Sequence, residues 1–344
     1  MIQVDYLIHA KWLIPCEDQH TVLENYALAI TDGNIVAILP SSKARQTYTA
    51  KESCEYTSHV VMPGLINAHT HLPMNLFRGL ADDLELMDWL NNYIWPAERK
   101  VVSDEFVYDG ALLAMGEMIR GGITCFNDMF FYRNATARAA EKVGMRAHIG
   151  IHMMNIESPD FETPEEYQVN AAAFCEHYRN HPLIQPTLAP HSTYTTELAN
   201  LTHLPEIAER YNLQINIHLQ ENAEEVAMSL TNHKMRPLQR LDSIGLVSPR
   251  LIAIHMTQLD ERDLAIVAEK KPNIVHCPES NLKLVCGICP VEQLQQLGVN
   301  VAIGTDSAAS NNDLDLFSEM RTAALIGKLA AKDPKALPAG RTLL

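Results

Sequence analysis

Apolar segments that alternate with stretches of helical period, from Val60 onward, constrain the fold of this chain more than any other feature. The segments are rich in residues that favour strands, and most are followed by a helical pattern. The expected strands lie at residues 60–71, 123–128, 146–151, 184–191, 214–218, 251–255, 273–277 and 299–306. About eight strands in such a series predict an α/β fold, the (β/α)₈ barrel of TIM type.

The residues before this series have a different pattern. Segments 26–30 and 34–38 read as short strands, and they flank Thr31-Asp32-Gly33, an Asp-Gly signal for a hairpin turn. We therefore expect a small N-terminal β domain, of sandwich type, over residues 1–58. The barrel is expected over residues 59–344.

Two helices of the barrel can be delimited from local signals. Ser103 is placed to cap a helix over residues 106–119, which Gly121 and Gly122 would close. Residues 197–211 have helical period throughout and predict one continuous helix.

Polar residues that can bind metal or move protons follow several of the expected strands. In a TIM barrel the carboxyl ends of all strands meet at one face, where active sites are built. The residues at these ends are His69, His71, His191, His218, His255 and Asp306. His152 and the other histidines outside strand ends are interpreted as structural or solvated, while His276 could belong to the core or lie near the metal.

A zinc site is the chemistry that these strand ends favour. His69 and His71 are two residues apart, so both imidazoles leave a strand on the same side. Three imidazoles and one carboxylate suit Zn²⁺, and we take His69, His71, His218 and Asp306 as the ligands. Glu221, three residues after His218, is either an acid/base over the metal or an ordinary surface glutamate.

Charge and cysteine content exclude several other classes of protein. With 27 basic and 42 acidic residues, the formal charge of −15 argues against nucleic acid or an anionic membrane as a partner. No long apolar run or signal segment is visible, so we expect a cytoplasmic protein. The seven cysteines do not predict a disulfide framework, and Cys286-x-x-Cys289 has no second pair, so we interpret both as loop cysteines rather than zinc ligands. The sequence leaves open whether the protein forms a homo-oligomer.

The combined motifs resemble the amidohydrolase superfamily. They are Pro63-Gly64-Leu65-Ile66-Asn67-Ala68-His69-Thr70-His71, His191, His218-x-x-Glu221, His255, His276-Cys277-Pro278-Glu279-Ser280-Asn281 and Gly304-Thr305-Asp306. Segments 77–84, 89–90, 95–98 and 307–312 are similar to its branch of 5-methylthioadenosine/S-adenosylhomocysteine deaminases. This branch is related to triazine hydrolases and guanine deaminases.

The resemblance implies a role for each matching position. It implies one zinc ion per subunit, because the strand at residues 183–189 has no lysine that could bridge two metals. It implies catalytic roles for Glu221, His255 and Asp306 in hydrolysing the C–N bond of a cyclic amidine, with release of ammonia. The implied substrate contacts are Glu98 on the ribose hydroxyls, His191, Glu221, Asp306 and Trp89.

The implied activity is zinc-dependent deamination of 5-methylthioadenosine and S-adenosylhomocysteine to inosine-type products. Two alternatives stay open. One is another amidohydrolase reaction, either guanine deamination or the dechlorination or deamination of triazines. The other is a truncated, inactive zinc-binding product, since relatives continue beyond the final segment, residues 337–344, so that the small β domain could be incomplete at its C-terminal side.

Overall fold

The protein is described by a computed structural model that covers residues 1–17, 21–155, 159–160 and 163–342. The end of the expected barrel domain, Leu343 and Leu344, lies outside the described residues. The chain divides into two compact units, each described by itself below. The first comprises Met1–Gly64 with the segment from Pro338 onward, and the second comprises Leu65–Leu337.

The first unit contains one four-stranded sheet in the order β3-β2-β1-β4. Its elements are β1 (Ile2–Leu13), β2 (Leu23–Thr31), β3 (Asn34–Pro40), α1 (Ser41–Thr47) and β4 (Tyr48–Val61). The expected hairpin is confirmed, because β2 and β3 pair antiparallel around Asp32 and Gly33. Both turn residues have positive φ, as a two-residue hairpin turn of type I′ requires. In place of the second sheet of a sandwich, α1 packs on the strands through the buried side chain of Ala44.

The second unit is an α/β barrel of TIM type, as the sequence predicts. Its eight strands, among the described residues, are parallel and lie in sequence order in one sheet. They are β5 (Leu65–Thr70), β6 (Ile123–Asp128), β7 (Arg146–Met153), β8 (Ile184–Pro190), β9 (Ile215–Leu219), β10 (Leu251–His255), β11 (Asn273–His276) and β12 (Val301–Ile303). A parallel bridge between Thr70 and Asp306 links the first strand to the end of the last, so the sheet closes at its carboxyl face.

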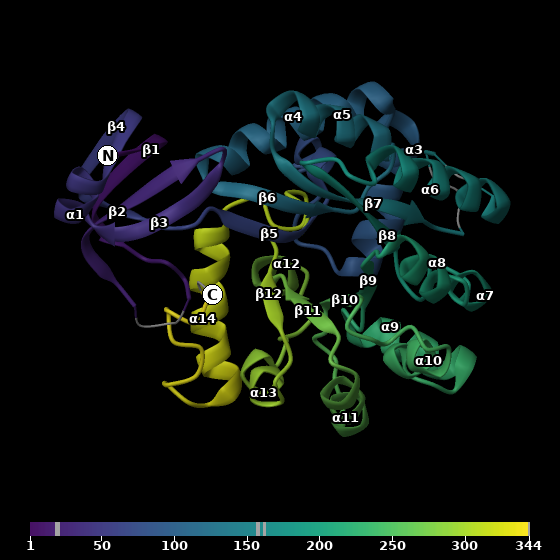
Figure 1. The fold of residues 1–344 in the computed structure, drawn as a ribbon. Coiled ribbons are helices and arrows are strands. Elements are labelled where there is room, and N and C mark those ends of the chain that lie inside the picture. Colours follow the sequence, from purple (N-terminus) through teal and green to yellow (C-terminus); the bar gives the residue numbers. More distant parts are fainter. Residues whose placement is uncertain (18–20, 156–158, 161–162, 343–344) are drawn as a thin grey trace. The chain divides into compact units, whose positions relative to one another are not determined.

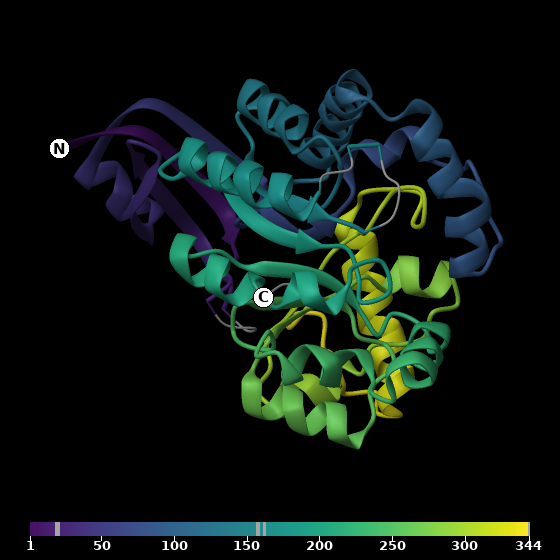
Figure 2. The ribbon, with the colours of Figure 1, turned by 90° about the vertical axis from the view of Figure 1, so that its right-hand side faces the viewer.

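The helices of this unit lie outside the strands, as Figure 1 and the turned view of Figure 2 show. After β5 come η1 (Leu72–Phe77), α2 (Leu86–Trp89), η2 (Leu90–Ile94), α3 (Trp95–Val101) and α4 (Asp104–Arg120). The later helices are α5 (Arg133–Val143), α6 (Pro164–Tyr178), α7 (Leu198–Leu201), α8 (Leu204–Tyr211), α9 (Ala223–His233), α10 (Pro237–Ser243), α11 (Glu261–Lys270), α12 (Pro278–Lys283), α13 (Val291–Gln296) and α14 (Leu316–Ala331). Among the described residues, no helix combines the length and the apolar character needed to cross a membrane.

Two expectations about element boundaries are wrong. The single helix over residues 197–211 is divided into α7 and α8, because Pro205 opens α8 at a first-turn position where its missing N–H costs nothing. The apolar run at Val60 and Val61 does not start the first barrel strand. It ends β4, where both residues pair with β1 in the four-stranded sheet.

A belt of polar side chains crosses the inside of the barrel. It consists of Asn67, Asn127, Thr187, Asn216 and Thr305, all buried. Asn216 Nδ2 donates to Thr187 Oγ1 at 2.8 Å and to Asn127 Oδ1 at 3.2 Å, and Asn67 Nδ2 donates to Thr305 Oγ1 at 2.7 Å. We call this set the polar belt. Because its members come from five different strands or strand ends, its hydrogen bonds join those strands across the barrel.

Candidate metal centre

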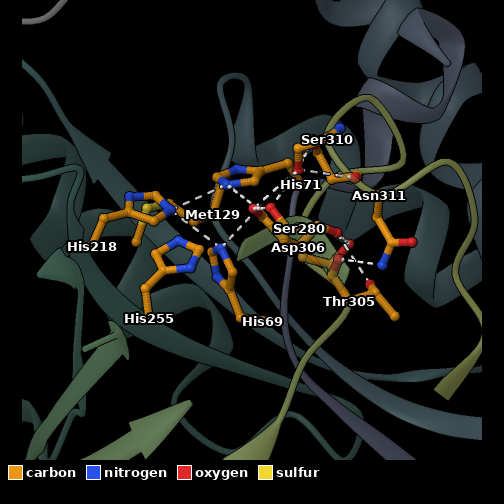
Figure 3. Close-up of polar contacts among 12 residues, drawn as sticks. His69, His71, Met129, His218, His255, Ser280, Thr305, Asp306, Ser310 and Asn311 are labelled. Atoms are coloured by element: carbon orange, nitrogen blue, oxygen red, sulfur yellow. Dashed lines mark hydrogen bonds and ion pairs between the residues drawn. The ribbon is translucent and has the colours of Figure 1, made fainter. Parts of the chain in front are cut away.

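Four side chains converge at the carboxyl ends of β5, β9 and β12. His69 lies on β5 and His71 directly follows it, His218 lies on β9, and Asp306 follows β12. One ligand atom from each side chain lies within 4.8 Å of the others. Figure 3 shows the three imidazoles and the carboxylate pointing toward one another. The structure thus brings together all four residues that the sequence predicts as metal ligands.

The spacing of these atoms fits a small tetrahedral ion. His218 Nε2 lies 3.2 Å from His69 Nε2 and 3.3 Å from His71 Nε2, while Asp306 Oδ1 lies 3.3 Å from both of those nitrogens. Zinc bonds of about 2.0–2.1 Å in a tetrahedron place neighbouring ligand atoms about 3.3–3.4 Å apart. These four distances are those expected of atoms that share one Zn²⁺, and nitrogen with oxygen is a ligand set that zinc accepts.

Hydrogen bonds from outside the ligand set orient three of the four side chains. Nδ1 of His71 donates to the carbonyl oxygen of Met129, and Nδ1 of His218 donates to the carbonyl oxygen of His191 at 2.7 Å. With the proton held on Nδ1, each Nε2 keeps its lone pair for a metal. The other oxygen of Asp306, Oδ2, accepts from Ser280 Oγ at 2.6 Å and from Ser310 Oγ at 3.1 Å.

The charge state of the cluster also suits a cation. Burial lowers the pKa of His69 to about 4, so this imidazole is neutral at pH 7. Burial acts to raise the pKa of Asp306, but hydrogen bonds and charge interactions with His69 and His71 hold it well below its usual value. Burial likewise holds the pKa of His218 well below its usual value. Burial also acts to lower the pKa of His71, but the hydrogen bond and charge of Asp306 raise it above its usual value, so a metal that binds here would displace a proton from this imidazole.

Glu221 and His255 form the second part of the site. Glu221 is buried, and burial together with the charge of Asp306 raises the pKa of its carboxyl to about 8. Its Oε1 lies 3.6 Å from His255 Nε2, and its backbone N–H donates to Glu225 Oε2 at 2.8 Å. His255 Nδ1 donates to Asn281 Oδ1 at 2.8 Å, which leaves Nε2 as an acceptor. A buried carboxylic acid that is protonated near neutral pH can serve as a general acid.

A pocket opens on the cluster and contains the other residues expected to bind substrate. Trp89 on α2, Glu98 on α3 and His191 at the end of β8 all line it, together with His71, His218, Glu221, His255 and Asp306. Burial raises the pKa of Glu98 to about 8. The Nδ1 atom of His191 lies 3.0 Å from Thr195 Oγ1, and its ring centroid is 4.8 Å from that of His218.

Several pocket residues are not singled out by the sequence, and His152, Tyr194 and Ser310 are polar examples. His152 lines the pocket, although it was interpreted as structural or solvated, because β7 continues to Met153 beyond the apolar run that ends at residue 151. Its ring lies 4.8 Å from Phe131 and 6.0 Å from His191. Tyr194 and Ser310 also line the pocket, and both come from loops whose position only the tertiary structure reveals.

The Cys286-x-x-Cys289 pair takes no part in the metal cluster. All seven cysteines are free, and Cys286 and Cys289 are buried. The thiol of Cys286 lies 3.8 Å from Glu221 Oε1, so it helps to enclose this carboxyl. Burial raises the pKa of both thiols, which makes the thiolate form unfavourable at neutral pH.

Comparisons with known proteins agree with this site. Residues 60–343 match the model of the amidohydrolase family. A protein of Saccharophagus degradans named 5-methylthioadenosine/S-adenosylhomocysteine deaminase is 44% identical over 333 residues, which is 97% of this chain and 75% of that protein. A 5′-deoxyadenosine deaminase of Methanothermobacter thermautotrophicus is 44% identical over 283 residues, 82% of this chain and 66% of that protein.

A solved structure extends the similarity to the whole fold. The crystal structure of an adenosine deaminase from Xanthomonas campestris with bound zinc superposes with a TM-score of 0.97 at 45% sequence identity. The match covers 99% of this chain and 78% of that protein.

Proposed function

The chain belongs to the amidohydrolase family, and from this premise we propose that it is a zinc-dependent deaminase of 5′-substituted adenosines, including 5-methylthioadenosine and S-adenosylhomocysteine. One observation carries the proposal. A pocket that opens on the four-residue cluster holds two buried carboxyls, Glu221 beside the cluster and Glu98 on α3. The first can act on an aminopurine and the second on a ribose.

The proposed reaction adds water to the purine carbon that carries the amino group. A C–O bond forms, the C–N bond to the amino group breaks, and ammonia leaves with an inosine-type product. His69, His71, His218 and Asp306 would hold zinc. When bound, zinc acts as a Lewis acid that lowers the pKa of water to about 7 and so supplies a nucleophile at neutral pH.

The protein's own acid and base groups divide the proton transfers. Glu221, protonated at pH 7 because its pKa is about 8, donates a proton to the ring nitrogen next to the reacting carbon. Asp306, ionised and held by the hydroxyls of Ser280 and Ser310, receives the proton that the attacking water loses. Asp306 then gives this proton to the amino nitrogen, which leaves as ammonia, while the new hydroxyl returns its proton to Glu221 and becomes the carbonyl of the product. His255 presents Nε2 as an acceptor and orients the water.

Glu98 supports a nucleoside rather than a free base as the substrate. It is buried in the pocket wall, and burial raises the pKa of its carboxyl to about 8. A neutral carboxylic acid has one O–H donor and acceptor oxygens, which match the two hydroxyls of a ribose. Guanine and triazines have no ribose, so this residue would have no partner with those substrates.

The experiment that tests the proposal follows the loss of adenine absorbance when zinc-loaded protein is mixed with 5-methylthioadenosine. Glu221→Gln should lower kcat by about 10²–10⁴-fold and leave the zinc content unchanged, because Glu221 is not a ligand. Glu224→Gln is the matched control, since Glu224 is an exposed glutamate on α9. A Glu221→Gln protein with a normal rate would remove this residue from the mechanism.

Guanine is tested in parallel, with ammonia release as the readout. Deamination of guanine without deamination of any adenosine derivative would replace the proposed substrate class by the alternative one.

We also propose that the protein works in the cytoplasm. All seven cysteines are free, which fits a reducing compartment.

A further inference from the structure

The pocket wall away from the metal ligands is strongly apolar. The residues that make up this apolar wall are Met74, Leu86, Leu90, Phe130, Phe131 and Met154. All six are buried, and all belong to one hydrophobic cluster built from η1, α2, η2 and the segments that follow β6 and β7. Thioether and alkyl groups pack well against such a surface, because methionine and aromatic side chains make favourable contacts with sulfur and carbon.

The part of this pocket that the structure describes has no permanently charged cationic side chain in its lining. Among the described residues that line it, none is a lysine or an arginine. The sequence from Met154 to Thr163, part of which lies outside the described residues, also contains neither. The histidine nearest the apolar wall, His152, is neutral at pH 7, because burial lowers its pKa to about 3.

Two cationic residues near the pocket, Lys283 and Arg133, have contacts outside its lining. Lys283 is the neighbour of Leu284, which lines the pocket, but its Nζ pairs with Asp82 at 2.5 Å and donates to Asn312 Oδ1 at 2.7 Å. Arg133 lies over the ring of Phe174, 6.0 Å from the ring centroid, and lines a separate pocket, although its charge also helps to lower the pKa of His152.

These observations bear on the 5′-substituent of the nucleoside. This step depends on the proposed function, in which the purine lies at the metal ligands and Glu221, and the ribose lies at Glu98. The 5′-substituent is then the part of the substrate that reaches the rest of the lining. That lining is the apolar wall with His152, His191 and Tyr194. The names of the relatives include a methylthio, a homocysteine and a 5′-deoxy compound. These names do not decide which 5′-substituent this chain prefers.

We propose that the site selects adenosines with an uncharged 5′-substituent, hydrogen or alkylthio, over those with the zwitterionic homocysteine tail. The carboxylate of homocysteine would lose its water on entering the pocket and find buried carboxyls rather than a cation. A buried charge without a partner is strongly unfavourable. We expect kcat/KM for S-adenosylhomocysteine to be about 10²-fold below that for 5-methylthioadenosine.

The test compares five substrates with the zinc-loaded chain. They are 5-methylthioadenosine, 5′-deoxyadenosine, 5′-butylthio-5′-deoxyadenosine, S-adenosylhomocysteine and S-adenosylhomocysteine methyl ester. The butylthio compound has a tail of the same length as homocysteine without its charges, and the methyl ester lacks only the negative charge. We expect the first three within about tenfold of each other in kcat/KM, and the ester, which keeps the ammonium group, to recover part of the loss.

Two results would overturn the selection by charge. One is equal kcat/KM for S-adenosylhomocysteine and the butylthio compound. The other is rejection of both long tails alike, which would assign selectivity to length. Calorimetric affinities for the same series, measured on zinc-loaded Glu221→Gln, separate this inference from the proposed function. If no nucleoside is deaminated but the uncharged tails bind more tightly, only the proposed reaction fails.

Discussion

The two ends of the pocket are held in place by different kinds of contact. At the metal end, ligands at strand ends are fixed by hydrogen bonds, such as those from His218 to the carbonyl of His191 and from Ser280 to Asp306. At the other end, the apolar wall is fixed by packing of short helices and loops within one hydrophobic cluster. Packing tolerates changes of side chain more readily than a hydrogen-bonded ligand set does.

This difference indicates where chemistry and where substrate choice are determined. The metal end can be shared by relatives with one reaction, while the apolar wall can change with the group on the ribose. Relatives at 44% identity are named for different 5′-groups, which fits this division. The predictions below test the two ends separately, starting with the largest effect.

Removal of zinc is expected to have the largest effect. Chelation should lower turnover by at least about 10⁴-fold, because water without the metal has a pKa of about 15.7 rather than about 7. Added zinc should restore the wild-type rate but not that of His218→Ala, which has lost a ligand. His203→Ala, at an exposed histidine on the surface, is the control. A chelated protein that keeps its rate, with zinc absent by metal analysis, would contradict a metal mechanism.

Glu98→Gln tests the boundary between the two ends. Loss of a hydrogen bond from a carboxyl to a ribose hydroxyl should lower kcat/KM by about 10–100-fold, mainly through KM. The effect should shrink with 3′-deoxyadenosine, because the substrate then lacks one partner of the interaction. Glu105→Gln, at an exposed glutamate on α4, should leave both constants unchanged. An equal loss with the ribose and deoxyribose substrates would separate Glu98 from the hydroxyls.

The same division explains what could be predicted from the sequence. The carboxyl ends of the strands can be predicted from the sequence, because apolar runs with period two end at residues such as His218. Barrel topology then brings these ends together. The eight strands and the four-residue cluster were found in this way. Periodicity predicts a strand but not the strand with which it pairs. For this reason the sequence places Val60 and Val61 in the barrel, whereas they pair with β1 in the four-stranded sheet.

Residues outside strand ends were harder to identify. Ser280 on α12 and Ser310 in the loop after β12 both contact Asp306, and nothing local in the sequence indicates these contacts. The sequence does not indicate His152 because the apolar run ends at Ile151. The last two residues of β7, His152 and Met153, therefore do not look like part of the strand. The apolar wall comes from several short segments after β5, β6 and β7, so its composition became visible only once the chain was folded.

The pH dependence of kcat/KM should report the carboxyl at the metal end. Glu221 is needed in its protonated form, and its pKa is raised to about 8. As pH rises through 8 the acid is lost, so kcat/KM should fall by about tenfold per unit above that value. Glu98 also has a pKa of about 8, but its substitution by Gln should leave this decline in place. A decline that disappears in Glu98→Gln would belong to the ribose contact instead.

The smallest effect concerns the polar belt. Asn216→Leu leaves Asn127 and Thr187 without their shared partner inside the barrel, and a buried polar group without a partner costs about 1–3 kcal/mol. Urea unfolding of the zinc-loaded protein should show this loss, while KM for 5-methylthioadenosine stays within about twofold, because Asn216 does not line the pocket. Asn232→Leu, at an exposed position on α9, should change stability by less than about 0.5 kcal/mol. If Asn216→Leu raises KM as strongly as Glu98→Gln does, the hydrogen-bonded interior controls the substrate end too, and the division between the two ends does not hold.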